Sequence, residues 1–226
     1  MRRRALHDTM KAATPKEAIL KKIRKALSES TPLPFPSSEG NQSVFQPAPE
    51  ELDMLFAEQF SRLQGKFVFC LDQQELQIRL EELALQQGFT KIYCRDQHLL
   101  ARFNEGPLRA RILDDTGKES LRHCDVAITG CECLIARTGS IVLSSGQDSG
   151  RTTSVYAPVH ICVATTDQLV YDIRDGLKLL KEKYGNKLPS FISFASGPSR
   201  TADIEKTLVV GVHGPKEVYL FLVDQS

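Results

Sequence analysis

Glu132 stands in the first of three polar clusters whose residue types and spacing could support chemistry. The cluster runs from Thr129-Gly130 to Thr138-Gly139, and each of these dipeptides follows a short apolar run. Small residues let a ligand approach the backbone, and a carboxylate such as Glu132 could act as a general base or as a nucleophile in proton or acyl transfer. The alternative interpretation is a loop carboxylate that only caps a turn.

The second cluster, residues 144–151, has the sequence SSGQDSGR. Glycines and hydroxyls in this density are typical of loops that hold an anion between backbone N–H groups, and Arg151 supplies a bidentate donor. The segment matches neither the P-loop pattern nor the dinucleotide-binding pattern. A flexible loop exposed to solvent is the alternative interpretation.

The third cluster, residues 197–205, follows the apolar segment Phe191–Ala195, which we expect to form a buried strand. Gly197 breaks this strand, and Ser199 or Thr201 is expected to cap a short helix. A strand that leads through a turn into a helix N-terminus is where open α/β sheets place ligands. Free N–H groups, hydroxyls and Arg200 would there suit a carboxylate or a phosphate.

Asp203 would lie in the first turn of that helix, where it could orient Arg200 or bind a substrate hydroxyl. Loops 144–151 and 197–205 both follow expected strands, so a parallel sheet would bring them to the same edge. We therefore predict that a small anion binds between these loops, held by Arg200 and Arg151.

Two histidines are candidates for proton transfer. His213 lies in a glycine-rich turn, and the usual pKa range of histidine suits a general acid or base. His160 starts an apolar strand, where a histidine is more often a buried residue with a satisfied hydrogen bond. The catalytic candidates are therefore Glu132, His213 and Asp203.

A regular alternation of strand and helix patterns separates these clusters. Leu134–Arg137 and Ser140–Leu143 are expected to form a hairpin that turns at Thr138-Gly139. The whole pattern predicts an α/β fold with a mostly parallel sheet covered by helices. Strands are expected at 66–71, 91–94, 125–129, 159–164 and 217–223, and helices at 50–63, 72–87 and 167–184.

Residues 1–48 differ in composition from the rest of the chain. Thr14 to Glu17 is typical of a helix start, and the apolar stripe that follows could dock on the same domain, which we favour, or bind a partner. The prolines and serines between residues 28 and 49 favour an extended linker. We expect an N-terminal helix with a proline-rich linker at 1–48 and one domain at 49–226.

Composition excludes several classes of function. The chain has 226 residues, 41% of them hydrophobic and 25% charged, which is ordinary for a globular protein. Its net charge of +1 gives no reason to expect nucleic acid or an acidic membrane as a partner. No apolar run approaches the roughly 20 residues that span a bilayer, and no secretory segment is evident, so we expect a cytoplasmic protein.

The six cysteines lie mostly in apolar, strand-like runs, and we expect them to be reduced and buried. Their spacing lacks the CxxCxxC run of an iron–sulfur protein. Cys124, Cys131 and Cys133 could in principle meet around a metal, but buried packing is favoured. We therefore expect no metal and no cofactor bound by this chain.

Three segments together resemble the LUD-domain family, and more narrowly its lactate-utilization protein C branch. They are ITGCECLIARTGSIVLSS at 128–145, YAPVHICV at 156–163 and SGPSRTADIEKTLVVGVHGP at 196–215, in the order of the family pattern. The resemblance implies a fold related to the sugar-phosphate isomerase and CoA-transferase superfamily. It also implies a role in oxidising L-lactate to pyruvate, beside partner subunits that carry iron–sulfur clusters.

One residue departs from the pattern of the family. An acidic residue usually precedes the Thr-Gly of the middle motif, and this chain has Arg137 there. If that acid is catalytic in relatives, this chain has lost it or uses Glu132 instead. Two alternatives therefore stay open: a non-catalytic assembly subunit, and an enzyme that acts on a CoA ester or a sugar phosphate through the superfamily pocket.

Overall fold

The computed structural model describes residues 15–28, 51–204 and 207–225. The chain divides into two units, Met1–Pro47 and Ala48–Ser226. In the first unit, helix α1 (Pro15–Ser28) agrees with the helix expected there, while Thr14, the expected cap, lies outside the described residues. None of the helices in the described ranges is both long and apolar enough to cross a bilayer.

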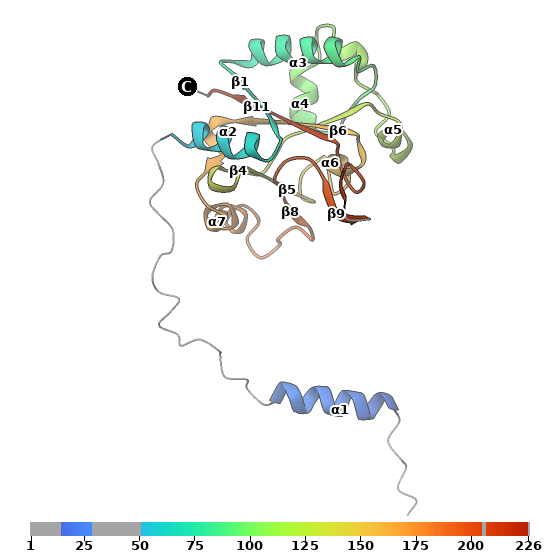
Figure 1. Ribbon diagram of the computed structural model, residues 1–226. Helices are drawn as coiled ribbons and strands as arrows, with labels where there is room; N and C mark the ends of the chain where they lie inside the picture. Colours follow the sequence, from blue (N-terminus) through green and yellow to red (C-terminus); the bar gives the residue numbers. More distant parts are fainter. Residues whose placement is uncertain (1–14, 29–50, 205–206, 226) are drawn as a thin grey trace, which may run out of the picture. The chain divides into compact units, whose positions relative to one another are not determined.

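A parallel sheet of five strands forms the centre of the second unit, as the alternating pattern predicted (Figure 1). The strand order is β1-β11-β6-β3-β2, and all four neighbouring pairs are parallel. The pairs β11–β6 and β3–β6 keep an unbroken register, and Cys162 of β6 lies between Leu220 and Thr129. The strands are β1 (Lys66–Cys70), β2 (Ile92–Cys94), β3 (Val126–Thr129), β6 (Val159–Thr165) and β11 (Glu217–Val223).

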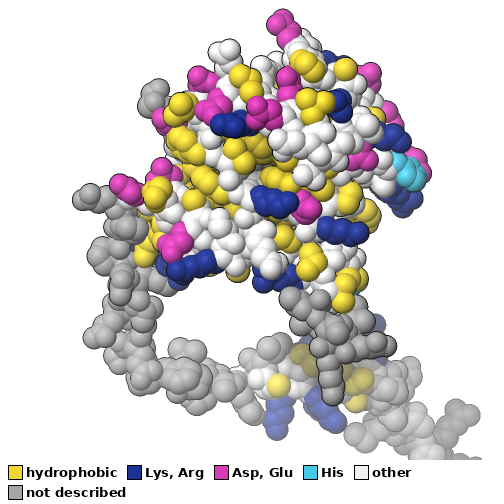
Figure 2. All heavy atoms as spheres, turned by 45° about the horizontal axis from the view of Figure 1, so that its top comes forward, with side chains coloured by type: hydrophobic (Ala, Val, Ile, Leu, Met, Phe, Trp, Pro, Cys, Tyr) yellow, Lys and Arg dark blue, Asp and Glu magenta, His cyan; other side chains and the backbone are white. Residues whose placement is uncertain are grey.

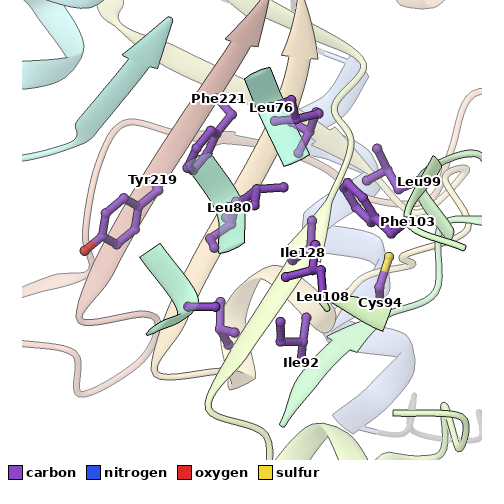
Figure 3. Close-up of a cluster of buried hydrophobic side chains, with 14 of the residues drawn as sticks. Leu76, Leu80, Ile92, Cys94, Leu99, Phe103, Leu108, Ile128, Tyr219 and Phe221 are labelled. Atoms are coloured by element: carbon purple, nitrogen blue, oxygen red, sulfur yellow. The ribbon is translucent and has the colours of Figure 1, made fainter. Parts of the chain in front are cut away.

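Helices α3 (Gln73–Gln87) and α4 (Gln97–Arg102) cover one face of this sheet. Helix α3 begins at Asp72, whose side chain accepts the Glu75 N–H, and ends at Gly88 in the left-handed region. Leu76 and Leu80 are one helical turn apart and therefore point together at the sheet. Figure 3 shows both leucines against Ile128 of β3 and Phe221 of β11 in the larger hydrophobic core.

A second sheet lies on the other face, which makes the unit layered. Its order is β7-β4-β5-β8, with β4 (Cys133–Ile135), β5 (Ser140–Ser144), β7 (Leu169–Val170) and β8 (Ile192–Ala195). Helix α2 (Leu52–Arg62) inserts Phe56 and Phe60 between the two sheets, and helix α7 (Ile173–Tyr184) packs Leu180 against the outer face. The expected hairpin is present, and Gly139 makes its turn in the left-handed region.

Short helices close the remaining side of the parallel sheet. The helices α5 (Lys118–Arg122) and α6 (Thr153–Tyr156) enclose a small core around Tyr93 and Ala127. The 3-10 helix η1 (Arg109–Arg111) precedes Ile112, which extends the edge beyond β2. Helices α4 and α5 and the 3-10 helix η1 lie in the segment 96–123, which has no clear period in the sequence.

Two expected helices differ from the structure. The helix expected after Gly197 is instead an antiparallel hairpin of β9 (Arg200–Ile204) and β10 (Thr207–Val210). Its β-branched residues explain the difference, because they favour strands and recur along both halves of the segment. The helix expected from residue 167 starts only at Ile173, after a 3-10 turn η3 (Thr166–Gln168) and β7.

Candidate functional site

A polar cavity of about 410 Å³ opens at the carboxyl ends of β3 and β6. Parallel sheets commonly bind ligands at this edge, because the loops that follow neighbouring strands meet there. Helix α4, the loops after β3 and β5, η3 and the end of α7 form its walls. The lining includes Asp96, His98, Arg102, Gly130, Gly146, Gln147, Asp148, Thr165, Asp167, Gln168 and Lys183.

The cavity combines acidic and basic side chains. Asp96 caps helix α4, since its Oδ1 accepts the N–H groups of His98 at 3.0 Å and Leu99 at 3.2 Å. Asp148 Oδ2 accepts the N–H of Gln97 at 3.3 Å, which joins the loop after β5 to the same helix. Arg102 makes no side-chain hydrogen bond or ion pair with the part of the chain that is described. Its guanidinium is therefore available to a ligand.

Glu132 is buried behind Lys183, which lines this cavity. Its carboxylate accepts hydrogen bonds from Lys183 Nζ at 2.8 Å, Tyr184 Oη at 2.7 Å and Ser144 Oγ at 2.5 Å. Burial favours the neutral acid, but the three hydrogen bonds outweigh it and hold the pKa of Glu132 below its ordinary value. Glu132 is therefore an ionised carboxylate that three donors of the chain hold in place.

Thr138 and Gly139 lie away from the cavity, beneath helix α2. Gly139 has a φ of 56°, and a Cβ there would stand 2.5 Å from the backbone nitrogen of Phe60. Thr138 Oγ1 contacts Ser140 Oγ at 2.7 Å, and Ser140 Oγ contacts Ser196 Oγ at 2.6 Å. In this structure the Thr-Gly pair therefore serves close packing of the hairpin against α2.

The expectation that loops 144–151 and 197–205 share one edge is wrong. Strands β5 and β8 pair antiparallel, with Ser144 opposite Ile192 and Ile141 opposite Ala195. The loop that follows β5 and the loop that follows β8 therefore emerge at opposite ends of this pair. Among the described residues of these two loops, 146–148 line the cavity and none of 197–204 does.

The two arginines expected to hold an anion have separate surroundings. Arg151 lies over the ring of Phe191, with its Cζ 5.2 Å from the ring centroid. Arg200 donates from Nη2 to the carbonyl oxygen of Leu63 at 2.8 Å. A single small anion between Arg151 and Arg200 would have to bridge opposite ends of the β5–β8 pair, so the structure does not support that arrangement.

The other residues of the third cluster have backbone roles. Gly197 has a φ of 90°, and a Cβ there would lie 2.5 Å from the Leu63 carbonyl oxygen. Ser199 exchanges backbone hydrogen bonds with Pro215 and Gly211. Thr201 and Asp203 belong to strand β9 and not to a helix, so the expected helix N-terminus is missing there.

His213 is exposed beside a second cavity, of about 450 Å³, formed by α6 and residues 211–216. This cavity lies next to the amino ends of β6 and β11, whereas Glu132 follows the carboxyl end of β3. His213 and Glu132 therefore cannot act on one small substrate. His160 is buried and shares a 2.8 Å hydrogen bond between its Nε2 and Thr129 Oγ1, as expected of a core histidine. Burial lowers the pKa of His160 to about 4.

With this geometry in place, comparison with known proteins identifies the family. The family model of the LUD domain matches residues 12–223. The chain belongs to the LUD-domain family.

Relatives of this LUD-domain chain include proteins named lactate utilization protein C. The one from Anoxybacillus flavithermus is 28% identical over 223 residues, which cover 92% of this chain and 100% of that protein. The one from Shouchella clausii is 30% identical over 161 residues, 67% of this chain and 70% of that protein. An uncharacterised protein of Neisseria meningitidis is 35% identical over 128 residues. The chain thus spans about half the length of some relatives that it matches. The aligned part is 53% of the Neisseria protein and 48% of lactate utilization protein C from Bacillus licheniformis.

The fold of the LUD domain also appears in a crystal structure of a DUF162-family protein from Deinococcus radiodurans. The two structures align with a TM-score of 0.59 and 20% identity, over 79% of this chain and 99% of the other. At this level of identity the likeness establishes the shared fold.

In this member of the LUD-domain family, Arg137 has a structural partner. Its Nε donates to Asp172 Oδ2 at 2.5 Å, and Asp172 is buried at the N-terminus of α7. A backbone hydrogen bond from Arg174, together with Arg137, keeps the pKa of Asp172 below its ordinary value despite burial. Arg137 is thus part of the contact between the hairpin and α7.

The cysteines of the LUD domain are all buried thiols, as expected. Cys124, Cys131 and Cys133 belong to three different hydrophobic clusters, so they do not meet around a metal. Burial raises the pKa of Cys94 and Cys133 to about 12, which keeps both thiols protonated. Within the described ranges no group of three or more His, Cys, Asp or Glu side chains is arranged to hold a metal ion.

Several cavity residues escaped the sequence analysis. Asp96 and Arg102 lie in the segment of mixed pattern, and Asp167 and Gln168 lay inside an expected helix. A signal for Asp96 did exist, because an aspartate two residues after a buried strand is both a usual helix cap and a residue at the ligand edge of a parallel sheet. Figure 2 shows that acidic and basic side chains are interspersed on the face drawn there, which agrees with the balanced composition.

Proposed function

We propose that this chain is a component of an L-lactate utilization system that oxidises L-lactate to pyruvate together with iron–sulfur partner subunits. The observation that carries the proposal is the match to lactate utilization protein C of Anoxybacillus flavithermus, which extends over the whole of that protein. Conversion of lactate to pyruvate releases two electrons and two protons, so an electron acceptor is required. The six cysteines of this chain are buried and divided among four hydrophobic clusters, which supports placing the iron–sulfur clusters in the partners.

The cavity at the carboxyl ends of β3 and β6 is the proposed place for a small carboxylate. Arg102 has a free guanidinium there, and planar guanidinium groups bind carboxylates with two parallel hydrogen bonds. His98 and Lys183 supply further donors. A cavity of about 410 Å³ is several times larger than lactate, which leaves room for a group supplied by a partner subunit.

A non-catalytic assembly subunit is the second candidate function, and the state of Glu132 favours it. All three hydrogen bonds to its carboxylate come from the chain itself and hold its pKa below the ordinary value, which makes Glu132 a weak base toward a substrate proton. In that case the cavity either binds a partner subunit or is a pocket inherited from the enzymes of the superfamily.

The test is reconstitution with the natural neighbours of this chain, followed by lactate-dependent reduction of a dye. Arg102→Gln is compared with Arg122→Gln, which changes an exposed arginine outside the cavity. If the chain binds the substrate, Arg102→Gln lowers the rate by about tenfold or more, since one charge-assisted contact contributes roughly 1.5–3 kcal/mol. The control variant keeps the wild-type rate.

The other outcomes separate the two candidates. A rate that requires this chain but tolerates Arg102→Gln indicates the assembly role. A rate that does not change when the chain is omitted contradicts both candidates. Calorimetric titration of the chain with lactate, pyruvate, phosphate and CoA adds a direct measure of the ligand, and a preference for CoA or a sugar phosphate would indicate an enzyme of the superfamily type.

A further inference from the structure

Strand β8 forms one edge of the four-stranded sheet. It pairs with β5 on one side, and no other described residue makes a backbone hydrogen bond to it in the sheet. The unpaired side of an edge strand offers a row of N–H and C=O groups to any further strand that can approach.

The register shows which groups of β8 face outward. Ser145 N–H donates to the Phe191 carbonyl at 2.9 Å, so residues 145 and 191 form a hydrogen-bonded pair. Hydrogen-bonded and non-hydrogen-bonded pairs alternate along antiparallel strands, and the register pairs Leu143 with Ser193 and Val142 with Phe194. Ser193 therefore bonds to β5, whereas the backbone groups of its neighbours Ile192 and Phe194 point to the free edge.

The side chains at this edge are apolar and accessible. Phe194 is 37% exposed, while Ile192 packs against the cluster that includes Leu180 of α7. From Leu188 to Ser199 the sequence contains no charged residue. Natural sheet edges are usually protected by charged residues, by proline or by bulges, and β8 itself has none of these.

We propose that β8 pairs antiparallel with β8 of a second copy of this chain, about a two-fold axis at Ser193. The outward groups of Ile192 would exchange two hydrogen bonds with those of the partner's Phe194, and the symmetry repeats this pair. Paired residues lie on the same face of a sheet, so each Ile192 packs beside the partner's Phe194. The two four-stranded sheets then become one continuous sheet across the dimer.

A second copy fits this edge better than an unrelated strand for two reasons. The segment is self-complementary, because the register centred on Ser193 satisfies all four outward groups of residues 192 and 194 at once. Strand β8 itself has no charged residue, so the residues that would pair meet without repulsion. The contact is short, so the dimer should be weak and should dissociate on dilution.

The first test is sedimentation velocity of the full chain over micromolar concentrations. The weight-average mass should rise from 25.2 kDa toward twice that value. Phe194→Lys introduces a charge at the edge and should raise the dimer dissociation constant at least tenfold. Phe69→Lys is the matched control, because Phe69 is 39% exposed on β1, an edge strand of the other sheet. This control should change the dimer dissociation constant by no more than about twofold.

The second test does not depend on a destabilising substitution. Residue 193 would face its own copy in a non-hydrogen-bonded pair with Cα atoms about 4.5 Å apart, within the range that a disulfide spans. Ser193→Cys should therefore give a disulfide-linked dimer on mild oxidation. Ser190→Cys, which lies away from the axis, should not, and all six native cysteines are buried. A monomeric wild type at every concentration, or equal cross-linking of both variants, would overturn the proposal.

Discussion

Lys183 Nζ lies 2.8 Å from a carboxylate oxygen of Glu132, although the lysine side chain is 56% exposed and that of the glutamate only 2%. The pair thus joins a buried anion to the wall of an open cavity. Burial alone would lower the pKa of Lys183, but its bond to Glu132 raises it above the ordinary value. Both groups are therefore charged at neutral pH.

This pair predicts a stability effect for Glu132→Gln. An amide cannot accept from all three donors, and one donor must face the new NH2 group. We expect the free energy of unfolding to fall by about 1–3 kcal/mol, measured by urea denaturation at pH 7. Glu58→Gln breaks an exposed pair with Arg62 and should cost only about 0–1 kcal/mol. Equal effects of the two substitutions would contradict the assignment of Glu132 as a buried, fully bonded anion.

His160 predicts how stability depends on pH. Its pKa is about 4 in the folded chain, because burial disfavours the charged ring, against 6.5 as the ordinary value. Between these two pH values the unfolded chain binds more protons than the folded chain, so stability rises with pH and falls on acidification. We expect up to about 3 kcal/mol of this dependence to disappear in His160→Gln. His123→Gln, which changes an exposed histidine, should retain the loss of stability that His160 causes on acidification.

Gly139 and Gly88 form a matched pair for a packing test. Both have positive φ, but a Cβ at Gly88 meets nothing within 4 Å, whereas at Gly139 it would lie 2.5 Å from the Phe60 nitrogen. Gly88→Ala should cost about 1 kcal/mol for the backbone conformation alone. Gly139→Ala should cost about 2–4 kcal/mol, since α2 must move as well. Thermal and urea unfolding measure the two losses of stability. Equal losses would mean that α2 can shift without destabilising the fold.

The boundary between the two units predicts the effect of truncation. A chain that starts at Pro49 keeps all the residues of the four hydrophobic clusters. We expect it to unfold cooperatively, with a melting temperature within a few degrees of the full chain. Circular dichroism against temperature measures this, and loss of the transition would show that residues 1–48 complete the core.

The alternating elements could be predicted from the sequence because each has a clear local period. Leu76, Leu80 and Ala84 recur at helical spacing, and β6 and β11 are apolar runs of strand length. The hairpin at 200–210 was mistaken for a helix, since Ile204 and Leu208 have a separation of four residues, which suits a helix face. The β-branched residues Thr201, Thr207 and Val209 were the competing signal.

The candidate site was harder to predict, because it depends on pairings between distant segments. Nothing local to Ser144 or Ile192 shows that β5 and β8 pair antiparallel, and that pairing alone separates the two glycine-rich loops. The cavity likewise brings together Asp96, Asp148 and Asp167 from three separate segments of the chain. Glu132 was found by its type and position, while its three hydrogen-bonding partners were not.

The contacts of α2 also have a consequence for the order of events during synthesis. This helix is the first element of the second unit, but the residues that contact it come much later in the sequence. Gly139 packs against Phe60, Gly197 packs against Leu63, and Arg200 donates to the Leu63 carbonyl. On the ribosome, α2 emerges long before these residues exist, so its apolar side with Phe56 and Phe60 must wait for most of the domain to be translated. Chaperones that shield nascent apolar segments would therefore have their longest engagement with this helix.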